Sequence, residues 1–149
     1  MGVFGGLFRS VANKRADSFE RLLTDISVIY TRRTIDDDPV VSMSFGGGDF
    51  KFEHMDVHVI FDESGSAVHL SSSPILRVPE SKVSSAVALC NEANTKDRWV
   101  KFYVDGDCDL MCDGDAIITD ATCADVCREM TGRMLTIIDE HYLAFMKVV

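Results

Sequence analysis

The sequence predicts an α+β fold in which an antiparallel β-sheet is flanked by three helices. Three segments repeat apolar residues at helical spacing, and the segments between them alternate apolar and polar residues as half-buried strands do. The strands are grouped between the helices instead of alternating singly with them, which argues against parallel βαβ units. We therefore expect the order α-β-β-β-α-β-β-α within a single domain spanning residues 1–149.

The first helix is expected over residues 9–26, where apolar side chains recur three or four residues apart between charged ones. The preceding residues, 1–8, are rich in glycine and apolar side chains, and we expect them to form a flexible or accessory arm. A short strand is expected at 29–34. Three aspartates and Pro39 then predict a turn, because aspartate side chains bond to nearby backbone groups and proline fixes φ.

Residues 40–45, 50–62 and 68–78 predict an antiparallel meander, because apolar and polar side chains alternate along them. The clearest of the three is 50–62, which has four apolar side chains on one face and polar side chains on the other. The third is expected to bend at Pro74.

The second helix is expected to begin at Pro79, because proline lacks an N–H that a first helical turn does not need. It is expected to end near Asn94. Two strands follow at 98–105 and 109–119, joined by a turn of aspartates and a glycine. We expect a kink in the second of them at Gly114.

The last helix carries the longest apolar stripe in the chain and is expected to run to about Met146. Thr122 and Asp125 resemble a capping box at its start. His141 falls on the apolar stripe, and we expect it to be a histidine of the core or its edge.

Composition excludes several classes of protein. The chain is 46% hydrophobic and 26% charged, which is typical of a globular domain with a real core. No apolar run approaches the ~18 residues of a membrane helix.

The net charge is −9, and the stretch from Asp105 to Asp125 contains seven aspartates without a lysine or arginine. Such a surface repels phosphate backbones, so we expect no nucleic-acid partner. It is either a solvated face or a surface for a basic partner.

The N-terminal residues lack the basic region and the long apolar region of a secretory signal. We therefore expect a cytoplasmic protein whose five cysteines are reduced.

Four cysteines form the first candidate metal site: Cys108, Cys112, Cys123 and Cys127. In an extended strand the first two would lie ~13 Å apart, too far for one zinc ion unless a tight hairpin joins them. The last two share one helix face as i and i+4. They are either half of a metal site or small apolar packing residues.

His54, Asp56 and His58 form a second candidate, because alternation puts all three on one strand face. Neighbouring members could bind a metal in pairs, whereas the two histidines lie ~13 Å apart on a flat strand. The alternative is a polar outer sheet face with a histidine–aspartate contact. No local signature places a cysteine or serine beside a histidine, so we expect no catalytic residues and no cofactor.

The second half of the chain carries a recognisable succession of motifs. A helix ends in Asn91-Glu-Ala-Asn94, and an aromatic strand runs from Trp99 to Asp105. An Asp/Gly turn, a second apolar strand and a long helix with Asp139 and Tyr142 near its end complete it.

This succession resembles the YbjN domain family of bacterial sensory transduction regulators, most clearly over residues 79–146. The resemblance implies the fold of type III secretion chaperones, and it brings no catalytic residues. Asn91, Asn94 and Asp105 match family positions. We expect a structural role for the two asparagines, because asparagine near a helix end adopts a left-handed conformation or bonds to the last carbonyls.

We therefore expect a non-catalytic protein-binding, chaperone-like or regulatory adaptor with a protein or peptide partner, and the resemblance to secretion chaperones allows a homodimer. The alternative is a metal- or redox-responsive regulator that uses the four cysteine thiols. A small-molecule enzyme is the third hypothesis.

Overall fold

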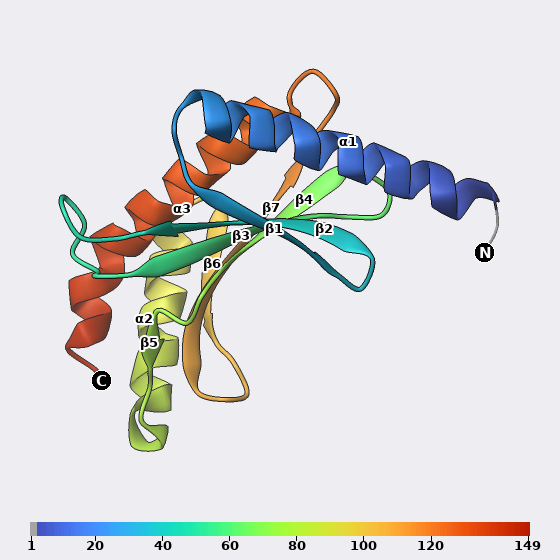
Figure 1. Ribbon diagram of the computed structural model, residues 1–149. Coiled ribbons are helices and arrows are strands. Elements are labelled where there is room, and N and C mark those ends of the chain that lie inside the picture. The colour runs from blue at the N-terminus through green and yellow to red at the C-terminus, as the bar shows by residue number, and fades with distance from the viewer. Residues whose placement is uncertain (1–2) are drawn as a thin grey trace.

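The computed structural model describes the backbone of residues 3–149 and the side chains from Val11 onward. Within this range three helices accompany a seven-stranded antiparallel sheet (Figure 1). The helices are α1 (Val3–Asp25), α2 (Val83–Lys96, after a 3-10 turn at Glu80–Lys82) and α3 (Cys123–Met146). The strands are β1 (Tyr30–Ile35), β2 (Asp38–Phe45), β3 (Met55–Phe61), β4 (Ala67–Ser72), β5 (Leu76–Arg77), β6 (Val100–Val104) and β7 (Asp109–Ile117).

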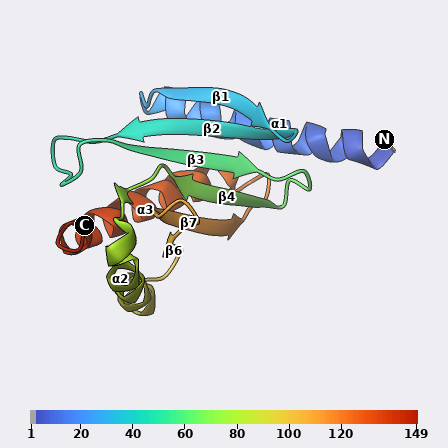
Figure 2. The same cartoon turned by 90° about the horizontal axis from the view of Figure 1, so that it is seen from below.

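The sheet has the order β1-β2-β3-β4-β7, and β7 also pairs with β5 and β6. Helices α1 and α3 lie across one face, and α2 packs beside α3 against β6 (Figure 2). The opposite face of β1 to β4 carries no helix (Figure 2). Side chains along β3 alternate between the two faces of the sheet. Each odd-numbered residue from Met55 to Phe61 is apolar and buried under the helices, which explains why the helices cover this face.

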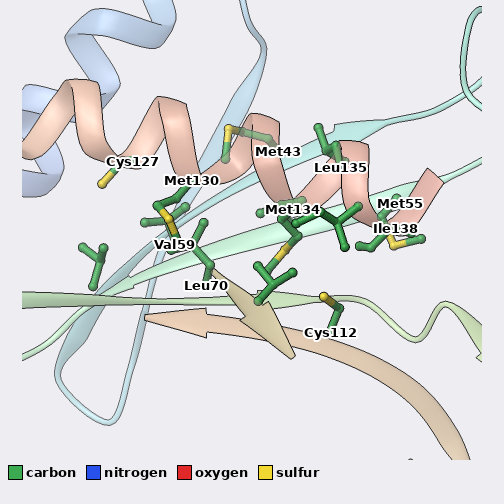
Figure 3. Close-up of a cluster of buried hydrophobic side chains, with 14 of the residues drawn as sticks. Met43, Met55, Val59, Leu70, Cys112, Cys127, Met130, Met134, Leu135 and Ile138 are labelled. Carbon is green, nitrogen blue, oxygen red and sulfur yellow. The ribbon is translucent and has the colours of Figure 1, made fainter. Parts of the chain in front are cut away.

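The core lies between α3 and the helix-covered face of the sheet (Figure 3). Side chains from β2, β3, β4 and β7 meet the buried stripe of α3 there. The labelled members are Met43, Met55, Val59, Leu70, Cys112, Cys127, Met130, Met134, Leu135 and Ile138.

Helix α3 also packs along α1, because Thr131 and Leu135 turn a second buried face toward it. Ion pairs also join β1 to α1, because the guanidinium of Arg32 lies 2.7 Å from Asp17 and 3.3 Å from Glu20. No helix in the described part of the chain combines the length and apolarity needed to cross a bilayer.

The predicted α+β class and the order of helices and strands are confirmed. The group of strands before α2 contains five members, of which β5 is only two residues long. Helix α1 extends back to Val3, so residues 3–8 are helical and continuous with the rest of α1. Residues 1 and 2 lie outside the described residues.

Three local expectations are wrong. The segment 50–54 is a loop and not strand, because Phe52 is buried against Tyr142 of α3, with ring centroids 6.2 Å apart. Helix α2 begins at Val83, after a 3-10 turn. Strand β7 is continuous through Gly114, and the kink expected there stays a prediction. The capping box is absent, since the hydroxyl of Thr122 accepts a bond from the N–H of Thr119.

We predict that Met134→Ala lowers the free energy of unfolding by about 2–5 kcal/mol, because it leaves a cavity in the core. Met134 is fully buried. Leu143→Ala on the same helix is the control, since Leu143 is 54% exposed. We expect it to change stability by less than about 0.5 kcal/mol. Urea unfolding measures both, and equal losses would contradict this packing.

Candidate functional site

The largest hollows of the described surface lie along the flank of α3 that faces away from α1. One has a volume of about 740 Å³ and the other about 650 Å³. Both are lined by Trp99, Arg128, Glu129 and Arg133, so they meet at Trp99. We call the combined depression the Trp99 groove. Its α3 wall includes Thr122, Val126, Glu129, Arg133, Thr136 and Glu140.

These positions recur three or four residues apart, so they form one continuous face of α3. The core uses the neighbouring faces of the helix. The opposite wall of the groove comes from the loop between α2 and β6 and from the end of β7. Segments far apart in the sequence therefore build this site.

Trp99 holds an unusual position in the groove. It stands just before β6 with a φ of 78°, in the left-handed region that bulky residues rarely adopt. A strained conformation of this kind is found most often at functional positions. Gly114 on β7 makes room for it, because a Cβ there would come within 2.9 Å of the Trp99 carbonyl oxygen.

Two contacts with α3 hold this loop. The guanidinium carbon of Arg133 lies 5.2 Å from the centroid of the Trp99 ring, in a cation–π arrangement. Two residues before the tryptophan, Asp97 lies 2.5 Å from Nε2 of His141. The His141 ring also packs edge-on against Phe102, so it is half-buried at the margin of the core.

One end of the groove is apolar. Ile117 is 84% exposed and Trp99 is 54% exposed, and Ala116, Val126 and Met130 lie around them. Single exposed apolar side chains are common on protein surfaces, whereas groups of them are rare. A group of exposed apolar side chains marks an interaction surface more often than a lone one does.

The rim of the groove carries both signs of charge. Arg133 bonds to Glu129 at 2.7 Å, and Arg128 lies 3.7 Å from Asp125. These four side chains are exposed, so their ion pairs contribute little to stability and are free to exchange partners.

The structure separates the four candidate cysteines. Cys108 is half-exposed in the β6–β7 turn, whereas Cys112 is buried in the core (Figure 3). Cys123 and Cys127 are buried at the start of α3. All are free thiols. No three His, Cys, Asp or Glu side chains in the described part of the chain are grouped to hold a metal.

Burial governs the chemistry of these thiols. It raises the pKa of Cys112 far above its ordinary value. The bond between Cys123 and Cys127 lowers the pKa of the first thiol, and with burial it raises that of the second. Cys123 has no exposed surface, so its lowered pKa does not make it accessible to a reagent.

His54 and Asp56 do form the expected histidine–aspartate contact, at 3.0 Å. They lie on the helix-free face of the sheet, where Asp56 also accepts a bond from Ser44. That bond comes first among the causes that lower the pKa of Asp56. On the same face, His58 Nδ1 lies 2.8 Å from the Ser42 hydroxyl.

The family-motif positions Asn94 and Asp105 bond to the backbone around β6. The amide of Asn94 accepts from the N–H of Phe102 at 2.8 Å and donates to its carbonyl at 2.9 Å. The side chain thus replaces a neighbouring strand, and does not bond to the last carbonyls of α2 as expected. Asp105 accepts from the N–H groups of Asp107 and Asp109, which closes the hairpin. Asn91 is exposed on α2.

Sequence reasoning missed the groove, although one signal for Trp99 was present. Val100 and Phe102 are the buried residues of β6, and side chains alternate between the two faces of a strand. The same alternation places Trp99 on the exposed face. Aromatic residues favour strands, so the pattern predicts Trp99 as a strand residue instead. Nothing local marks Ile117 or Arg133, because only the fold brings them to Trp99.

The sequence profile of one family, described as "Putative bacterial sensory transduction regulator", matches residues 16–147. The chain belongs to the YbjN family. The resemblance seen in the second half of the sequence is thereby confirmed, and it extends back to residue 16, within α1.

A solved structure agrees with this assignment. The crystal structure of YbjN from E. coli, described as "a putative transcription regulator", superposes with a TM-score of 0.59. The match covers 87% of this chain and 92% of that chain at 15% sequence identity. At this identity the likeness shows the shared fold. No protein of curated function matches the sequence.

We predict that Asn94→Ala lowers the free energy of unfolding by about 1–3 kcal/mol, because it leaves both backbone groups of Phe102 without their partner. Asn91→Ala, at the exposed asparagine three residues earlier, is the matched control. It should stay within about 0.5 kcal/mol of the parent. Thermal and urea unfolding measure the stability of both variants. An Asn94→Ala protein as stable as the parent would contradict the structural role of the two bonds to Phe102.

We also predict that iodoacetamide modifies Cys108 first in the folded protein. Cys108 is half-exposed, whereas the other four thiols are buried, and burial raises the pKa of Cys90 to about 11. Peptide mass spectrometry over time measures each thiol, with a urea-unfolded sample as the control. Modification of Cys112 as fast as Cys108 would show that the core described here is wrong.

Proposed function

We propose that this protein is a non-catalytic regulatory adaptor of the cytoplasm that binds a segment of another protein in the Trp99 groove. The observation that carries the proposal is the pairing of exposed Trp99 and Ile117 beside an open face of α3. Tryptophan and arginine are the residues most enriched among those that dominate binding energy at protein interfaces. Here Trp99 and Arg133 stack on each other in the middle of the groove.

The dimensions of the groove support a polypeptide occupant. Its α3 wall runs from Thr122 to Glu140, which corresponds to about 27 Å of helix. That length fits an extended segment of about eight residues or a helix of about five turns. The apolar end at Ile117 would take the anchoring side chains, and the charged rim would pair with a segment that carries both signs.

Two features support a binding role over a catalytic one. The family is described as a regulator. On the helix-free face, the Ser42–His58 pair has no carboxylate bonded to the histidine within the described residues, since Asp56 bonds to Ser44 and His54. A serine nucleophile usually needs both a base and a group that orients the base.

The thiol hypothesis receives less support. Three of the four cysteines are buried, and Cys112 lies in the core away from Cys127 (Figure 3). A metal or oxidant would have to reach them through packed side chains.

We predict that Gly132→Gln abolishes capture of a partner or weakens its binding at least tenfold. Apart from the backbone of its own helix, a Cβ added at Gly132 meets nothing within 4 Å, and Gly132 lines both the groove and the hollow between α1 and α3. The glutamine side chain should fill the groove without disturbing the fold. The measurement is affinity capture from cell extract, followed by titration of the purified partner against each variant.

Gly106→Gln is the matched control. Gly106 is also free of neighbours within 4 Å, and it lies in the β6–β7 turn away from the groove. It should bind the partner as the parent does. Equal binding by both variants, or equal loss in both, would contradict a partner site in the groove.

A further inference from the structure

The helix-free face of the sheet has a pocket of its own, separate from the Trp99 groove. It has a volume of about 410 Å³, within the range of sites for small molecules. Strands β1, β2 and β3 form its floor. The lining includes Ile29, Thr31, Arg33, Ser42, Asp56 and His58.

The register of the sheet explains why polar groups converge here. Thr31 lies opposite Ser42, and Ser42 lies opposite His58, so one hydroxyl or imidazole from each of three strands shares a row. All three side chains project from the face without helices. Ile29, which is 88% exposed, forms an apolar wall at the end of β1.

Arg33 is the cation of this pocket, and it differs from its neighbour in the sequence. Arg32 turns to the helix side, where Asp17 and Glu20 neutralise it. Arg33 projects to the other face and has no carboxylate within ion-pair distance among the described side chains. A guanidinium in this position offers a fork of N–H donors to an incoming anion.

The surrounding groups are suited to an anion. The Ser42 hydroxyl lies 2.8 Å from Nδ1 of His58, which leaves Nε2 of the ring available to a ligand when that hydroxyl donates. Asp56 is the opposing charge, yet it is already bonded to Ser44 and His54. Burial and the nearby Arg33 lower the pKa of His58, which favours the neutral ring, so Arg33 supplies the charge for an anion and His58 supplies an N–H.

We propose that this pocket binds a small organic anion whose carboxylate or phosphate group lies between Arg33 and His58, within reach of the hydroxyls of Thr31 and Ser42. The apolar part of the ligand would rest against Ile29. The site is independent of the Trp99 groove, since it lies on the opposite face of the sheet. In a chain with a net charge of −9, Arg33 gives this pocket a guanidinium that no described carboxylate pairs with, and this group would attract the anion.

The test is an NMR titration of the histidine ring resonances with inorganic phosphate and, separately, with acetate, at constant ionic strength set by chloride. We expect a saturable shift of the His58 signals with at least one probe. His69 projects from the same face, on β4, and does not line the pocket, so it serves as the internal control and its signals should move much less. Saturation by phosphate alone assigns the site to phosphorylated ligands, and saturation by acetate alone assigns it to carboxylates.

Arg33→Gln should weaken the binding at least tenfold, and Arg77→Gln, at an exposed arginine far from the pocket, should leave it unchanged. The backbone amide signals of each variant report its fold in the same experiment. Shifts that rise linearly and equally at His58 and His69 would overturn the proposal, as would full affinity in the Arg33→Gln protein.

Discussion

Helix α3 is packed against the sheet through a stripe of methionine, isoleucine and cysteine side chains, and the rest of the structure depends on this contact (Figure 3). The stripe fixes the rotation of the helix. Once Met134 and Ile138 face the sheet and Leu135 faces α1, the flank with Glu129 and Arg133 must face outward. Arg133 can then stack on Trp99, so the groove is a consequence of how the core is filled.

The same contact makes the two faces of the sheet different. Residues of one parity on β3 enter the core, and those of the other parity, Asp56 and His58, remain on a polar face without helices. The molecule thus presents a groove with an apolar end at the flank of α3 and a polar pocket on the helix-free face of the sheet. A protein segment and a small anion could occupy them without competing for space.

Sequence periodicity predicted the elements that are stabilised by burying one face. The period of two in β3 and the helical period of α3 identified both elements, because burial of one face stabilises each. Elsewhere tertiary packing outweighed the pattern. The alternation predicts a strand at Phe52, but Phe52 lies in a loop and packs against Tyr142. The groove was not predictable, because the left-handed backbone of Trp99 depends on space at a distant glycine, Gly114.

The central claim is that the Trp99 groove holds a partner polypeptide, and Trp99 is the only tryptophan in the chain, so its fluorescence reports directly on the site. The decisive measurement is acrylamide quenching of this fluorescence in the free protein and in its complex with a purified, tryptophan-free segment of the partner. The account predicts ready quenching of the half-exposed ring when free and strong protection, with a blue-shifted spectrum, when bound. Equal quenching in the two states would contradict it.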